Sequence, residues 1–127
     1  MKLGLFFLLI ILGPTISAQK YVRSGLEKGI QVDHRWKLPK SGPPELLLRI
    51  SNTTEVHKQV HVTVDVAYQG MTREVFEADT CIRSHQVLDG KLNGIFFISS
   101  ALDGDGIRRG DVDITLDRLE VLDGECP

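Results

Sequence analysis

The residues whose types and spacing could do chemistry include four aspartates in the segment 103–113. They are Asp103, Asp105, Asp111 and Asp113. Alternating carboxylates with an intervening glycine resemble the start of a calcium loop, in which oxygen atoms enclose the ion. The register of such a loop fails, however, because the alignment puts Val112 where a bidentate carboxylate is needed. We therefore predict an ordinary acidic turn, with a loose calcium site at these aspartates as the alternative.

The histidine and serine patterns do not predict catalysis. The four histidines are His34, His57, His61 and His85, and no pair has a metal-binding spacing on an expected helix. Ser84 and His85 are sequence neighbours, and neighbouring side chains on an extended chain point in opposite directions. No nucleophile elbow, phosphate-binding glycine loop or histidine zinc motif occurs. We expect a protein that is not an enzyme and has no cofactor or metal.

Two short strings match functional motifs, and both are interpreted as turns. Arg109-Gly110-Asp111 is the tripeptide of cell-adhesion ligands, but matches of three residues arise by chance. Asn52-Thr53-Thr54 would be a glycosylation acceptor only in a eukaryotic secretory route. Elsewhere it is a good turn sequence, because asparagine supports tight backbone geometry.

The sequence contains two cysteines, Cys81 and Cys126. An even number of cysteines in an exported protein favours one disulfide. Closing a loop of this size would stabilise the fold by roughly 4 kcal/mol and tie down the C-terminus. A redox or metal-binding pair is the competing interpretation, which the wide spacing of the two cysteines disfavours.

The first eighteen residues predict a secretory signal peptide. Lys2 precedes an apolar run from Leu3 to Leu12, and the segment ends in Ser17-Ala18, which suits signal peptidase. The run is shorter than the roughly 20 residues of a membrane-spanning helix, so we expect no stable membrane insertion. Residues 19–127 are then one domain in the periplasm or secreted. The net charge of −2 and the absence of a basic run give no reason to expect nucleic acid as a partner.

Apolar residues in the rest of the chain recur with a period of two, as in β-strands. Strands are expected at 30–36, 46–50, 60–68, 72–76, 95–98 and 112–121, the last with a bulge near Asp117-Arg118. The segments 84–90 and 103–106 are expected to be loops. This pattern predicts an all-β fold, a single antiparallel immunoglobulin-like β-sandwich of about six or seven strands.

The most regular strand is "VHVTVDVAY" at residues 60–68. Because side chains alternate between the two faces of a strand, its valines are expected in the core. His61, Thr63 and Asp65 would then form a polar face open to solvent or a partner, which is the candidate interaction face.

The segments "ELLLRISNTTEVHKQVHVTVDVAYQG" and "CIRSHQVLDGKLNGIFF" carry a resemblance. Over residues 45–98 the chain resembles small exported immunoglobulin-like proteins of Bacteroidota, in which similar strands and turns occur in the same order. The resemblance implies a periplasmic setting and a sandwich fold. Such proteins have no assigned function, so it implies no active site.

These observations together favour an exported, non-enzymatic module that binds or supports another extracytoplasmic macromolecule, either a protein or a glycan. One alternative is a carbohydrate- or calcium-associated binding domain that uses the 103–113 loop. A second alternative is an inhibitor of a hydrolase or protease.

Overall fold

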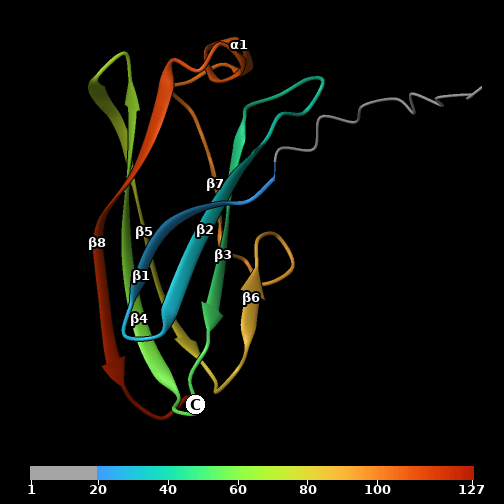
Figure 1. The fold of residues 1–127 in the computed structure, drawn as a ribbon. Helices are drawn as coiled ribbons and strands as arrows, with labels where there is room; N and C mark the ends of the chain where they lie inside the picture. The colour runs from blue at the N-terminus through green and yellow to red at the C-terminus, as the bar shows by residue number, and fades with distance from the viewer. Residues whose placement is uncertain (1–19) are drawn as a thin grey trace, which may run out of the picture.

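The computed structural model describes residues 20–127, which form two packed antiparallel β-sheets (Figure 1). The five-stranded sheet contains β1 (Val22–Glu27), β2 (Ile30–Lys37), β3 (Glu45–Asn52), β6 (Val87–Asp89) and β7 (Phe96–Ile98). The three-stranded sheet contains β5 (Met71–Ile82), β4 (Lys58–Tyr68) and β8 (Val112–Asp123), in that spatial order. The prediction of an all-β sandwich is confirmed. The predicted signal peptide, residues 1–18, lies outside the described residues.

The core lies between the two sheets and is centred on β4. The four valines at positions 60, 62, 64 and 66 of this strand are at most 3% exposed, as the alternation predicted. They pack in one cluster with buried residues of β2 and β3, including Val32, Leu48 and Ile50. The stacked rings of Phe76 and Phe97, with centroids 4.6 Å apart, join β5 of one sheet to β7 of the other. Each sheet therefore buries one face in the core and turns its other face away from the core.

The bulge in the last strand is confirmed. The pairing of β4 with β8 shifts between Thr63, which faces Arg118, and Val64, which faces Leu116. Asp117 is the extra residue, and it lets the apolar alternation resume on the same face at Leu119.

Four local expectations differ from the structure. β1 was not anticipated, and together with β6 it brings the count to eight strands. β5 continues to Ile82 instead of ending at residue 76. Part of the expected 84–90 loop is β6, which adds to the edge of β3. Part of the expected 103–106 loop is the helix α1 (Gly104–Arg108), because the Asp103 carboxylate accepts the Gly106 N–H at 2.9 Å and caps the first turn. Among the described residues, no helix is long and apolar enough to span a membrane.

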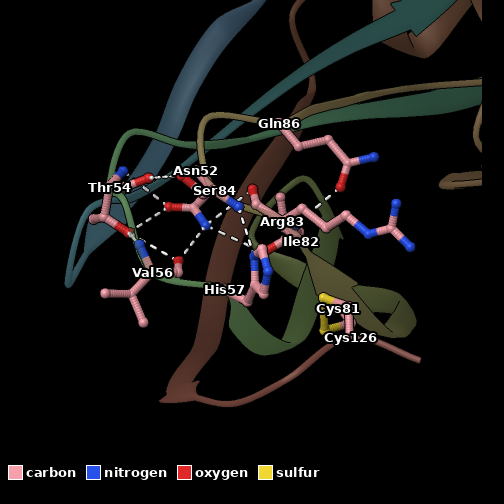
Figure 2. The surroundings of a disulfide bond; sticks show 10 residues. All are labelled: Asn52, Thr54, Val56, His57, Cys81, Ile82, Arg83, Ser84, Gln86 and Cys126. Carbon is pink, nitrogen blue, oxygen red and sulfur yellow. Dashed lines mark hydrogen bonds between the residues drawn. A yellow bond between two sulfur atoms is a disulfide. The ribbon is translucent and has the colours of Figure 1, made fainter.

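Asn52 ties the two sheets together where β3 ends (Figure 2). Its side-chain amide donates to the backbone carbonyls of Val56, Ile82 and Arg83 at 2.8, 3.1 and 3.2 Å. Its carbonyl oxygen accepts the backbone N–H and the hydroxyl of Thr54. Asn52 is only 2% exposed. Asn52 of the Asn-Thr-Thr string is therefore a buried structural residue, and its side-chain amide has no room for a glycan.

Val64→Ala should destabilise the fold far more than a matched change on the outer face. Removing buried methyl groups should lower the free energy of unfolding by about 1 to 3 kcal/mol, because Val64 is 1% exposed. Val75→Ala, at a position 56% exposed on β5, should change it by less than about 0.5 kcal/mol. Urea unfolding followed by circular dichroism measures both. Equal losses would show that the facing of the strands is misassigned.

Asn52→Ala should also destabilise the fold, because it leaves buried carbonyl groups without a donor. We expect a loss of about 1 to 3 kcal/mol in the free energy of unfolding. The control is Asn93→Ala, at an exposed position whose carbonyl oxygen accepts one backbone N–H. A similar loss for the two variants in thermal unfolding would contradict the structural role assigned to Asn52.

Candidate functional site

Cys81 and Cys126 form a disulfide, as the sequence predicted, with their Cα atoms 5.4 Å apart (Figure 2). Cys81 lies near the end of β5, and Cys126 follows β8. These are the two outer strands of the three-stranded sheet. The bond therefore links the two edges of that sheet near the start of β4, where Cys81 lies opposite Gln59.

His61 projects from the outer face of β4 between two carboxylates. The strand register places Asp79 of β5 on one side of it and Glu120 of β8 on the other. The His61 Nδ1 atom lies 2.5 Å from the Asp79 carboxylate. This hydrogen bond raises the pKa of His61 above its ordinary value, and the charges of Asp79, Glu77 and Glu120 act in the same direction. The arrangement favours an imidazolium on an acidic surface.

The other two residues of the candidate interaction face behave differently from His61. Thr63 points outward, but it is only 7% exposed, so the expectation that it is open to solvent is wrong. It lies in the central strand, between the long side chains of Glu77 and Arg118 on the neighbouring strands. Asp65 is partly buried and accepts the Thr72 hydroxyl at 3.2 Å, while its Oδ1 atom is buried without a partner.

Carboxylates predominate on the outer face of the three-stranded sheet. Cross-strand partners point to the same side of a sheet, so the register assigns the members of this face. The acidic members are Asp65, Glu77, Asp79, Asp113 and Glu120. Arg118 is the basic residue among them, and it lies 3.6 Å from Glu120. Two exposed apolar residues, Val75 and Leu122, complete what we call the acidic face.

A shallow hollow of about 400 Å³ lies on the acidic face beside the disulfide. Its lining residues are Gln59, Val60, His61, Asp79, Thr80, Cys81, Glu120 and Leu122. They come from all three strands of the sheet. The hollow therefore depends on the correct register of β5 and β8 against β4.

Sequence reasoning found His61 but missed its carboxylate neighbours. Asp79 and Glu120 lie on other strands, and a single strand's alternation does not reveal which residues stand opposite it. In β5, Val75, Glu77 and Asp79 occupy alternate positions and therefore lie on one face. This periodicity could have extended the predicted strand and identified Glu77 and Asp79 as members of the acidic face.

The three components of a catalytic triad, a hydroxyl, a histidine and a carboxylate, are matched in order by Thr63, His61 and Asp79. The Thr63 hydroxyl is 3.4 Å from His61 Nε2, on the ring atom opposite the one that contacts Asp79. A nucleophile must reach its substrate, however, and Thr63 is only 7% exposed. The backbone of β4 is paired with strands on both sides, so its N–H groups are committed to the sheet and do not form an oxyanion hole.

The four aspartates of the 103–113 segment do not converge. Asp103 caps α1, and Asp105 pairs with Arg108 at 3.0 Å. Asp111 pairs with Arg109 at 3.0 Å, so the arginine and aspartate of the Arg-Gly-Asp string bind each other. Asp113 lies on β8, on the acidic face. Among residues 20–127, no three histidine, cysteine or acidic side chains are grouped as a metal site requires.

His34 lies away from the acidic face, on β2, and is partly buried. Its Nδ1 atom forms a hydrogen bond with the Ser24 hydroxyl. Burial lowers the pKa of His34, while the charge of Asp33 acts in the opposite direction. His34 is therefore a partly buried, hydrogen-bonded histidine.

Comparisons with known proteins add no assignment, since no family model matches this chain and no match was found among curated proteins or solved structures.

Breaking the disulfide should lower the melting temperature. In Cys81→Ser or Cys126→Ser the unfolded chain gains freedom, and the expected loss is about 2 to 5 kcal/mol. Peptide mapping without reductant should recover the two cysteines as one linked pair from protein made in an oxidising compartment. Two free thiols in that sample would contradict the bond.

His61 and His34 should titrate on opposite sides of the ordinary histidine pKa of 6.5. NMR titration of the ring protons should give a higher pKa for His61 and a lower one for His34. Because folding raises the pKa of His61, its contribution to stability is present below pH 6.5 and is lost as pH rises through the folded value. Asp79→Asn should bring the pKa of His61 down. An unchanged value would contradict the role of the Asp79 hydrogen bond.

Proposed function

We propose that this chain is an exported, non-enzymatic β-sandwich module that binds another extracytoplasmic protein through its acidic face. The partner surface would be basic, with apolar side chains that cover Val75 and Leu122. The runner-up partner is a glycan bound on the same face.

The observation that carries this proposal is the concentration of carboxylates on one rigid sheet face. Asp79 and Glu120 flank His61, and all three line a hollow together with Leu122. A surface of one charge sign attracts partners of the opposite sign and speeds their association. Exposed apolar residues next to such charges supply area that a protein partner can bury.

A protein partner is favoured over a glycan by the composition of the acidic face. None of the residues that the strand register places on this face is a phenylalanine, tyrosine or tryptophan. Carbohydrate sites usually present exposed aromatic rings against which a sugar packs. Carboxylates and aliphatic side chains suit a basic protein surface better.

Two features support a binding role over hydrolysis at Thr63, His61 and Asp79. The hydroxyl is covered, and the paired backbone of β4 offers no donors for an oxyanion. The interaction of Asp79 with His61 is then a positioning contact, which fixes the imidazole within the binding face.

Export is supported by the disulfide and by the resemblance over residues 45–98. A disulfide is typical of an oxidising compartment outside the cytoplasm. The resemblance to exported immunoglobulin-like proteins of Bacteroidota points to the same compartment, specifically the periplasm.

The test is affinity capture from an extracytoplasmic extract, with the acidic face altered. The variant Asp79→Asn/Glu120→Gln keeps the shape of the face and removes two charges beside His61. The matched control is Glu27→Gln/Glu55→Gln, which changes two exposed carboxylates elsewhere. Quantitative mass spectrometry should find a protein retained by the wild type and the control but depleted at least tenfold with the face variant. Equal retention by all three would contradict the proposal, and retention of a glycan alone would favour the runner-up.

A further inference from the structure

A second, basic cleft lies on the opposite side of the molecule, on the outer face of the five-stranded sheet. Its volume is about 280 Å³. Its lining residues are Tyr21, Arg35, Lys37, Leu47, Asp89, Lys91 and Leu92. They come from the segment before β1, from β2 and β3, and from β6 and the turn that follows it (Figure 1). The cleft is independent of the acidic face and of the function proposed for that face.

Tyr21 lies against two arginines and fixes them over the sheet. The guanidinium carbons of Arg49 and Arg35 are 4.4 and 5.1 Å from the centre of its ring. Its hydroxyl donates to the Asp89 carboxylate at 2.9 Å. Stacking of a guanidinium on an aromatic ring restricts its orientation. Both arginines are therefore held in place before any ligand arrives.

The two arginines differ in whether a carboxylate of the protein already forms an ion pair with them. Arg49 forms an ion pair with Asp33 at 3.1 Å, and that carboxylate is buried. Within the described part of the chain, Arg35 forms no ion pair, and its Nε atom is buried without a hydrogen-bond partner. The charge of Arg35 is therefore not neutralised by a carboxylate of the described residues, and a ligand anion at the guanidinium would pair with it.

Other side chains complete a site for a small anion. Lys37 follows Arg35 by two positions on the same strand, so both point to the outer face. Lys91 is bound to Glu45 at 2.7 Å at the rim of the cleft. Leu47 is buried beneath the cleft and Leu92 is 88% exposed beside it, so an apolar wall adjoins the cations.

We propose that this cleft binds a ligand of one sugar ring in size that carries a carboxylate, with Arg35 and Lys37 as its anion-binding groups. The planar guanidinium matches the two oxygens of a carboxylate. The volume is close to the lower limit of small-molecule sites, which is about 300 Å³, so it suits one ring better than a chain. Leu47 and Leu92 would contact the carbon skeleton of the ring.

The experiment is an NMR titration of the ¹⁵N-labelled protein with glucuronate, using the Arg35 Nε–H signal as a reporter of changes around the guanidinium. Glucose is the control for the ring, and sulfate at equal ionic strength is the control for charge. We expect glucuronate to shift the Arg35 and Leu92 signals in a saturable way, with little effect from glucose. Equal shifts with sulfate would overturn the assignment to a carboxylate, and no saturable shift with glucuronate would overturn the site.

Variants separate binding from folding. Arg35→Gln should weaken glucuronate binding about tenfold or more, and Lys37→Gln should weaken it severalfold. Lys37 is exposed, so its replacement leaves the fold intact even if Arg35→Gln does not. Arg73→Gln, at an exposed position on β5, is the matched control and should bind as the wild type does. Unchanged affinity in Lys37→Gln, together with unchanged affinity in any folded Arg35→Gln, would overturn the proposal.

Discussion

The buried side-chain amide of Asn52 is the interaction on which the relation between the two sheets depends. It stands at the end of β3 in the five-stranded sheet and donates to backbone carbonyls where β5 of the three-stranded sheet ends. Asn52 is almost fully covered, so water does not replace these bonds. The end of β5 is thereby fixed, and with it the positions of Cys81 and Asp79. Through Asp79 the same constraint reaches His61 on the acidic face.

The central strand β4 is held rigidly because its inward side chains and its backbone hydrogen-bonding groups all have partners. Its valines fill the core, and its backbone is paired on both sides along the strand. The disulfide joins β5 to the segment that follows β8, so neither edge strand can shift without the other. Side chains on such an element keep their spacing, which a preformed binding face requires. These constraints together hold His61 and its neighbours in place.

The two outer faces of the sandwich carry opposite charge, although the net charge of the whole chain is only −2. Carboxylates surround His61 on the three-stranded sheet, whereas Arg35 and Lys37 remain without acidic partners within the described residues of the five-stranded sheet. A charge separation of this kind orients a molecule in the field of its partners.

The sequence by itself determined the local features, namely the strands with period two, the buried valine face of β4, the bulge at Asp117 and the pairing of the cysteines. These follow from side-chain alternation and from the small number of cysteines, which are properties of short segments. The acidic residues around His61, the covered state of Thr63 and the basic cleft at Arg35 were decided only by the tertiary structure. Each depends on which strands are neighbours and in which register they pair, and long-range pairing leaves no mark in the sequence of a single strand.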